Sequence, residues 1–202
     1  TGLLGLAALG TLPVLMPTAL GKPDPDAAGW LRRRLWLVAS GALALATGAA
    51  IAWPFAAPGA LLILVTAMGL AGQWVRRYGL RLLVSDGVAA SLFASVLGLM
   101  ASLLAGLLHG AGMLPTKPSL LVWAAGFLLP LVTGALSQLL PVWRWPGPVI
   151  PARGLMRQKL AASGSVRGAL FLGAALALIC DWVPLGAGLM LGGLVLFVVG
   201  LL

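Results

Sequence analysis

The chain has almost none of the side chains on which most enzyme active sites depend. Its 202 residues include one cysteine, Cys180, one histidine, His109, and no glutamate. A single cysteine excludes a disulfide within the chain and a metal site of the Cys-x-x-Cys kind. Chemistry that needs several imidazoles or paired glutamates cannot be supplied by this chain alone, so we expect no complete catalytic site within it.

Charged residues are also scarce. They make up 8% of the chain, whereas hydrophobic residues make up 61%, and a soluble domain usually carries about 25% charged residues. Several apolar runs approach the ~20 residues that span a bilayer. A helix satisfies its own backbone hydrogen bonds in lipid, which an open sheet does not. The sequence therefore predicts a single all-α integral membrane domain over residues 1–202.

Seven apolar segments are separated by turns and charged loops. We expect membrane-spanning helices at about residues 2–20, 35–53, 60–75, 87–108, 119–143, 168–183 and 187–202. Residues 54–59 contain two prolines and are expected to form a short turn. Residues 144–167 are expected to form the longest loop, in which the stretch LMRQKLAA predicts a short amphipathic helix on the membrane surface.

The net charge of +9 has an uneven distribution along the chain. Twelve of the thirteen Lys and Arg residues fall in the first, third and fifth loops. This alternation is the positive-inside pattern of membrane proteins, not a nucleic-acid-binding patch. We therefore expect a multi-pass protein of the bacterial inner membrane, with the N-terminal end outside and the C-terminal end inside, and no nucleic-acid partner.

Two arginine runs stand out within these loops, Arg32, Arg33 and Arg34 in the first and Arg76 and Arg77 in the third. We expect them to fix the topology and to bind lipid phosphates. Docking of a partner subunit is the alternative interpretation.

Two proline motifs suggest an internal repeat. Residues 10–17 (GTLPVLMP) and 134–141 (GALSQLLP) share the pattern G-x-L-x-x-L-[ML]-P and lie four segments apart. This spacing predicts a parallel repeat of four helices, and the alternative is a chance match among common residues. Pro13, Pro17 and Pro141 are expected to kink or unwind their helices and so to act as structural breaks.

The same stretches carry a family resemblance. GTLPVLMPTALGK, followed by an Arg-rich loop, and TGALSQLLPVW resemble the membrane portion of bacterial copper-oxidase-like and nitrite-reductase-like proteins. In that family, polytopic helices precede a periplasmic cupredoxin-type domain. Those helices are in turn similar to the haem-copper oxidase catalytic subunit and to the NnrS family. The resemblance implies a membrane subunit or anchor domain that supports a respiratory or redox complex or a periplasmic copper protein.

The chain departs from this family in its histidines. The family has a histidine upstream of the GTLP-like stretch, at a position that would precede Thr1, and haem-copper oxidases need several intramembrane histidines. This chain has only His109. We therefore expect no cofactor within the chain, with copper or haem as the alternatives that the resemblance implies. Because Thr1 already lies in an apolar run, we also expect the chain to be a portion of a longer protein.

His109 is the candidate metal ligand. It ends a stripe of small residues at helical spacing: Ser91, Ser95, Gly98, Ser102 and Gly106. Such a stripe lets helices approach closely, so it should face protein. With Met113 four residues on, His109 would suit copper. The alternative is an interfacial histidine hydrogen-bonded to a loop carbonyl.

Asp181 ends a second stripe, after Gly173 and Ala177. The predicted topology places it at the same membrane face as His109, so the two could form a polar pair that orients a ligand or accepts a proton. The alternative is a solvated aspartate. This region supports a second hypothesis, a copper-handling or small-molecule transporter. A third is a fragment of a haem- or quinone-binding respiratory protein.

Polar residues also interrupt the fifth segment. Ser137 and Gln138 lie close to Pro141, and Thr133 and Gln73 are expected to join them. Polar groups inside a membrane are costly unless they are paired. We expect them to satisfy the backbone carbonyl that Pro141 leaves free, with a quinone or small-substrate contact as the alternative.

Overall fold

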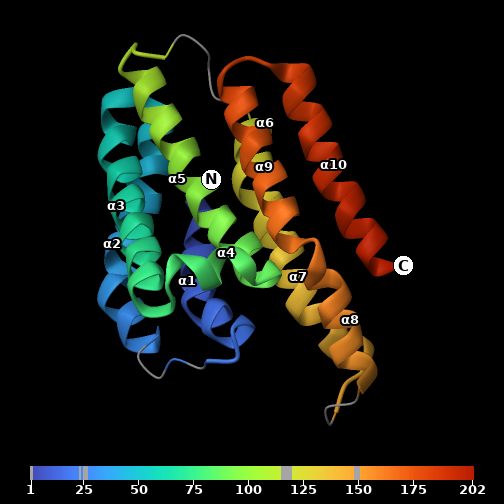
Figure 1. The fold of residues 1–202 in the computed structure, drawn as a ribbon. Coiled ribbons are helices and arrows are strands. Elements are labelled where there is room, and N and C mark those ends of the chain that lie inside the picture. The colour runs from blue at the N-terminus through green and yellow to red at the C-terminus, as the bar shows by residue number, and fades with distance from the viewer. Residues whose placement is uncertain (1, 23, 25–26, 115–119, 148–150) are drawn as a thin grey trace.

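The computed structural model describes residues 2–22, 24, 27–114, 120–147 and 151–202. Over those residues the chain is helical and contains no strand (Figure 1). The elements follow in the order α1 (Gly2–Ala19), α2 (Ala27–Ile51), α3 (Trp53–Tyr78), α4 (Leu80–Ser85), α5 (Gly87–Gly110), α6 (Leu120–Trp123), η1 (Ala124–Leu128), α7 (Leu129–Arg144), α8 (Pro151–Ala162), α9 (Gly164–Ile179) and α10 (Val183–Leu201).

The helices have the length and composition of membrane spans. Six stretches are long and apolar enough to cross a bilayer: Arg32–Ile51, Trp53–Tyr78, Gly87–Gly110, Leu120–Arg144, Pro151–Ile179 and Val183–Leu201. α1 adds a shorter apolar helix over Gly5–Ala19. The predicted all-α membrane fold is confirmed, and these stretches follow the order of the expected apolar segments.

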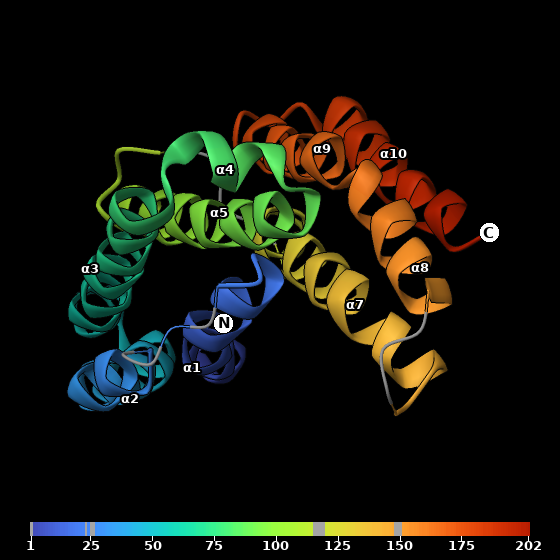
Figure 2. The same ribbon diagram turned by 60° about the horizontal axis from the view of Figure 1, so that its bottom comes forward.

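α5 is the central helix of the bundle. It contacts α1, α3 and α4 on one side and η1, α7, α8 and α9 on the other, while the α2–α3 and α9–α10 pairs lie at opposite flanks (Figure 2). In its most apolar window, 72% of the residues are buried inside the protein, against 22% for α2 and 17% for α10. α5 is therefore surrounded by protein, whereas α2 and α10 leave most of their apolar surface for lipid.

Small residues bring other helices close to α5. A Cβ on Gly98 would overlap the carbonyl oxygen of Gly126, and one on Gly87 would overlap that of Ala161. Ser91 and Gly98 are buried, as expected for a stripe that faces protein. The polar start of α5 is fixed by Asp86, whose Oδ1 accepts a hydrogen bond from the Ala89 N–H at 2.9 Å, an N-cap that satisfies one of the free donors there.

Several expected boundaries are wrong, and the reasons are local. α3 begins at Trp53 and runs through the expected 54–59 turn: Pro54 stands in the first turn, where its missing N–H costs nothing, and Pro58 lies inside the helix at the cost of one backbone hydrogen bond. α2 begins at Ala27, so its arginines lie on a helix and not in a loop. α9 begins at Gly164 and therefore includes Arg167, which was expected in the long loop. α8 contains the LMRQKLAA stretch, whose helical conformation was expected.

The three prolines of the repeat motifs do not interrupt their helices. α1 continues through Pro13 and Pro17, and α7 continues through Pro141. The helices are not unwound at these positions, since each proline removes one backbone hydrogen bond from an otherwise continuous helix, and the expected kinks stay a prediction. The four-helix repeat that the motifs suggested stays a prediction.

The regular hydrogen-bond pattern of the expected fifth membrane segment is broken at η1, well before Pro141. There the Leu129 N–H bonds to the carbonyl of Ala124, five residues back, which makes a single π-helical turn. Pro130 follows immediately and has no N–H of its own. Such bulges insert one residue into a helix. This one lies where Gly126 meets Gly98 on α5.

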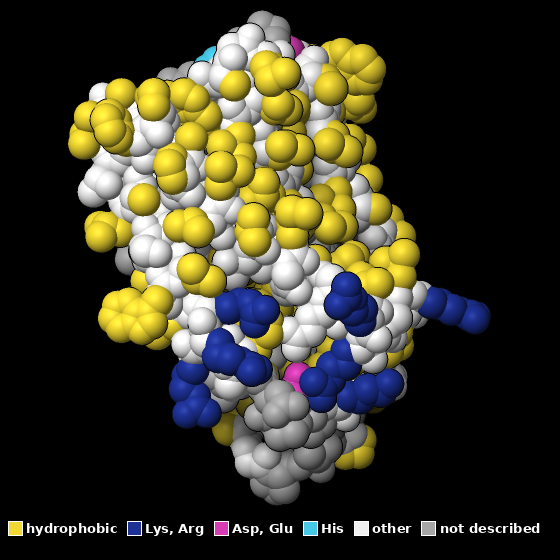
Figure 3. Space-filling model, turned by 90° about the vertical axis from the view of Figure 1, so that its left-hand side faces the viewer, with side chains coloured by type: hydrophobic (Ala, Val, Ile, Leu, Met, Phe, Trp, Pro, Cys, Tyr) yellow, Lys and Arg dark blue, Asp and Glu magenta, His cyan; other side chains and the backbone are white. Residues whose placement is uncertain are grey.

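The two ends of the bundle differ in charge. The end at which α2 begins and α3 ends, called here the basic end, carries Arg32, Arg33, Arg34, Arg76 and Arg77. Figure 3 shows Lys and Arg side chains gathered at one end of this face, with hydrophobic side chains over the remainder. His109 and Asp181 lie at the opposite end, where α5 and α9 finish.

Substituting Gly98 tests the close crossing of α5 and η1. Gly98→Ala should lower the free energy of unfolding by about 2 kcal/mol or more, because its Cβ would overlap backbone atoms that cannot rotate away. The matched control is Gly106→Ala on the same helix, where an added Cβ meets nothing within 4 Å and alanine favours the helix by up to about 1 kcal/mol. Thermal unfolding in detergent, followed by circular dichroism, measures both. Equal effects of the two substitutions would contradict the crossing.

Candidate functional site

The most unusual side chain in the described structure is Arg167, in the first turn of α9. Its relative exposure is 0%, and it is the largest fully buried side chain. The helix starts at Gly164, against the backbone of Gly87 at the start of α5, which leaves no room for a Cβ at either position. This close approach directs the guanidinium of Arg167 into the interior of the bundle and not toward the membrane surface.

The guanidinium connects helices that are distant in sequence. Nη2 donates to Ser91 Oγ on α5 and to Ser137 Oγ on α7, both at 3.2 Å. Nη1 donates to the Leu160 carbonyl of α8 at 3.4 Å. The guanidinium carbon Cζ lies 5.1 Å from the ring centroid of Phe197 on α10, which is within cation–π range. One side chain therefore joins α9 to α5, α7, α8 and α10.

Both serines are oriented to act as acceptors toward the arginine. The hydroxyl of Ser137 donates to the Thr133 carbonyl at 2.7 Å, and that of Ser91 donates to the carbonyl of Gly87 or Gly164, each at 3.1 Å. A hydroxyl has one hydrogen and two lone pairs. Because the hydrogens are used on backbone carbonyls, the lone pairs are left to face the cation.

No carboxylate balances this charge within the described part of the chain. The ion pair that the structure contains joins Arg77 to Asp24 at 2.7 Å, at the basic end. Asp86 caps α5 and forms no ion pair with Arg167. The Nε of Arg167 is buried and has no hydrogen-bond acceptor among the described residues. Burying a cation with neutral partners alone costs several kcal/mol, so the arrangement needs a reason other than stability.

Sequence reasoning placed Arg167 at the end of a loop and so missed this site. The available signal was its surroundings: Gly164 and Gly168 flank it at helical spacing, and an apolar run follows at once. Ser137 was singled out, but for a different partner, the carbonyl freed by Pro141. Gln138, expected to share that role, has a buried Oε1 without a hydrogen-bond partner in the described structure.

The predicted site at the opposite end is organised differently. His109 Nδ1 lies 2.8 Å from the carbonyl oxygen of Leu114, so this nitrogen carries the hydrogen and donates. This is the loop-carbonyl bond of the second interpretation of His109. In the neutral imidazole this bond leaves Nε2 with its lone pair, as in histidines that bind metals through the other nitrogen. Met113, four residues on, is 75% exposed.

His109 and Asp181 form no hydrogen bond or ion pair in the structure, although both are described. Asp181 is exposed and has a φ of 63°, in the left-handed turn that ends α9. Among the described residues, no three His, Cys, Asp or Glu side chains cluster as a metal site would require. Copper at His109 and Met113 therefore stays a prediction.

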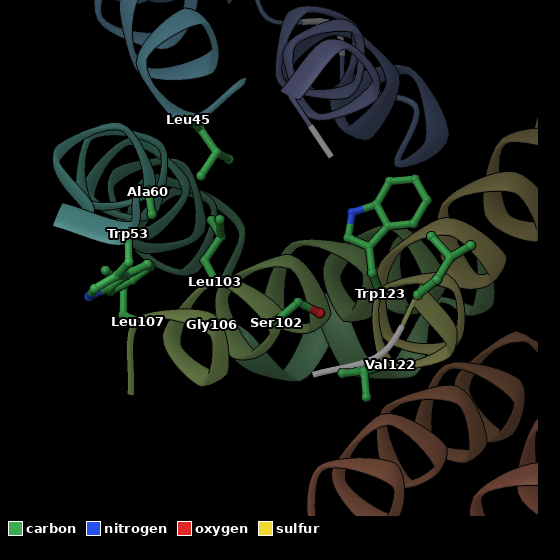
Figure 4. A pocket seen from close by; sticks show the side chains of 10 residues that line it. Leu45, Trp53, Ala60, Ser102, Leu103, Gly106, Leu107, Val122 and Trp123 are labelled. Carbon is green, nitrogen blue, oxygen red and sulfur yellow. The ribbon is translucent and has the colours of Figure 1, made fainter. Parts of the chain in front are cut away.

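A cavity of about 330 Å³ lies between α2, α3, α5 and α6 in the half of the bundle nearer His109. Its lining is mostly apolar: Leu45, Trp53, Ala60, Ser102, Leu103, Gly106, Leu107, Leu120, Val122 and Trp123. Figure 4 shows the indole nitrogen of Trp123 on the side of its ring that faces Leu45 and Leu103, whereas that of Trp53 points away. The Trp123 N–H is buried and has no hydrogen-bond partner among the described residues.

Comparison with protein-family models, with curated proteins and with solved structures finds no match for this chain. The resemblance to the membrane portion of copper-oxidase-like proteins therefore stays a prediction from the two proline motifs. What the structure adds is independent of that resemblance: a buried cation held by serines, and an apolar cavity with an unused donor.

The arginine network predicts a specific pattern of coupled substitutions. Ser137→Ala should lower the free energy of unfolding by about 2 kcal/mol, because a hydrogen bond to a buried charged group contributes about 1.5–3 kcal/mol. Arg167→Met should be neutral or stabilising, since it removes a buried charge and leaves both serines their backbone acceptors. In the Arg167→Met background, Ser137→Ala should then cost little.

Thermal unfolding in detergent of the two single variants and the double variant gives this coupling energy. Ser40→Ala is the matched control, because its hydroxyl is exposed and bonds only within its own helix. A cost of Ser137→Ala that is the same with arginine and with methionine at position 167 would show that the arginine contact contributes nothing.

Proposed function

We propose that the chain is a membrane subunit or anchor domain of a redox complex or a periplasmic copper protein, without a complete catalytic site of its own. It would lie in the bacterial inner membrane with its basic end in the cytoplasm, as the distribution of Lys and Arg suggests. The redox partner rests on the resemblance of the two proline motifs. The anchoring role rests on how the described polar side chains are used.

The observation that carries the anchoring role is the arginine network. Arg167, Ser91 and Ser137 are fully buried, as Ser95 is, and the guanidinium of Arg167 bonds to both Ser91 and Ser137 across helices. The bonds of Arg167 run between helices and hold them together, whereas those of Thr66, Ser95 and Thr133 use their hydroxyl hydrogens within single helices. Bonds between helices suit a rigid membrane scaffold.

The cavity favours a second candidate function, the binding of a quinone-like molecule. Trp123 offers a buried N–H donor, and the hydroxyl of Ser102 donates to the Gly98 carbonyl at 2.8 Å and keeps its lone pairs. An apolar ring that carries a carbonyl oxygen would satisfy the Trp123 donor and fill the apolar walls. Such a ligand would fit a respiratory partner.

Purification from native membranes tests the first proposal. The chain should co-purify with at least one larger subunit, and its visible spectrum should show no haem in stoichiometric amount. A haem band at one equivalent per chain would overturn the proposal, as would a monodisperse chain without a partner at native expression. Copper that is bound by the wild-type protein and lost in His109→Ala would support the transporter hypothesis instead.

Trp123→Phe tests the cavity separately. It keeps the aromatic ring and removes the N–H, so affinity for a short-chain quinone should fall by about twofold to tenfold, the equivalent of one neutral hydrogen bond. Trp53→Phe is the control, because that ring lines the same cavity with its nitrogen turned away. Equal effects of the two substitutions, or no quinone binding by the wild-type protein in detergent, would exclude this candidate.

A further inference from the structure

A second cavity opens between α2 and α3 at the basic end, about 620 Å³ in volume. Its polar lining consists of Arg34, Gln73, Arg76 and Arg77, and its wall includes Trp30. A neighbouring hollow of about 590 Å³ shares Trp30, Arg34 and Gln73 with it. The two adjoining hollows are together called here the basic cleft.

The cleft is open because two of its wall residues have no side chain. Gly69 and Gly72 line it, and an added Cβ at either would meet nothing within 4 Å. The opposite wall is fixed: Trp30 is 5% exposed, and the guanidinium carbon of Arg34 lies 4.7 Å from the centroid of its ring. This stacking holds Arg34 at the rim and leaves the edges of its guanidinium free to donate hydrogen bonds.

The arginine side chains around the cleft are only partly paired with carboxylates of the described residues. Arg77 is paired with Asp24 at 2.7 Å. Neither Arg34 nor Arg76 forms an ion pair with a carboxylate in the described part of the chain. Two unpaired guanidinium groups and the amide of Gln73 therefore line one depression. Guanidinium groups bind carboxylate and phosphate through paired, charge-assisted hydrogen bonds, so the cleft suits an anionic group of this kind.

The surface that continues from the cleft shows which anionic compound fits. Along α3, Val65, Met68 and Arg76 are exposed on one face of the helix, with the apolar residues on the side of the membrane interior. On α2, Leu37 is exposed beside the cleft. A ligand that placed its phosphate on the arginines would lie with its remainder against apolar side chains of two membrane-spanning helices, as an acyl chain does.

We propose that the basic cleft binds the headgroup of an anionic phospholipid, with a phosphate held by Arg34 and Arg76 and acyl chains along Leu37, Met68 and Val65. Basic pockets between membrane-spanning helices on the cytoplasmic side are suited to such headgroups. The site is independent of the redox partner and of the cavity near Trp123.

Native mass spectrometry of the full chain, released from nanodiscs that contain phosphatidylglycerol, cardiolipin and phosphatidylcholine, tests the proposal. The wild-type protein should retain phosphatidylglycerol or cardiolipin, and the double substitution Arg34→Gln with Arg76→Gln should lower that occupancy at least about tenfold, as two lost charge-assisted bonds imply. Arg34→Lys with Arg76→Lys keeps the charge and should retain part of the binding.

The matched control is Arg153→Gln with Lys159→Gln on α8, which removes the same charge at the same end of the bundle (Figure 1). An equal loss in this control would show attraction by net charge alone and would overturn the site. Retention of phosphatidylcholine at the same level as anionic lipid would also overturn it.

A third arm adds inorganic phosphate in detergent: if phosphate alone raises the unfolding temperature as much as the lipid does, the ligand is a soluble phosphate. Circular dichroism confirms that the variants are folded.

Discussion

The constraint on which this structure depends is that a membrane interior offers no water to a buried polar group. Arg167 meets this constraint without a described carboxylate: two serine hydroxyls, one backbone carbonyl and an aromatic ring surround the charge. The serines can accept its hydrogen bonds only because their own hydrogens are used on helix carbonyls. The positions of α5, α7, α8 and α10 around α9 are therefore tied to one another through a single side chain.

Close helix packing is the second requirement of that network. The guanidinium reaches Ser91 because Gly87 and Gly164 let the backbones of α5 and α9 touch. About three turns farther along α5 from Gly87, Gly98 meets Gly126 in the π-helical turn. In lipid there is little hydrophobic drive for one apolar helix to prefer another, so small residues and interhelical hydrogen bonds decide which helices associate. Here the two devices occur along the same face of α5.

Hydropathy predicted the membrane class and the order of the helices, and the stripe of small residues predicted the face of α5 that meets protein. These features depend on composition and on the spacing of residues within one helix. The boundaries at Pro54 and Gly164 were wrong because a proline in a first turn and a glycine at a helix start are compatible with both a loop and a helix. Arg167 was missed for a different reason. Its burial is decided by residues far away in the sequence, Ser91 and Ser137, and no periodicity within one helix reports contacts of that kind.

The presence of an arginine at position 167 is itself informative. A methionine would fill similar space without the cost of burying a charge, so the arginine must provide something that an apolar side chain does not. A planar guanidinium donates in fixed directions, and here those directions point to α5, α7 and α8 at once. Apolar packing permits small rotations of one helix against another, whereas these bonds permit one arrangement. A membrane domain that must present a constant surface to a partner needs that property more than it needs additional stability, which is why the network supports a scaffold in preference to a transporter that changes shape.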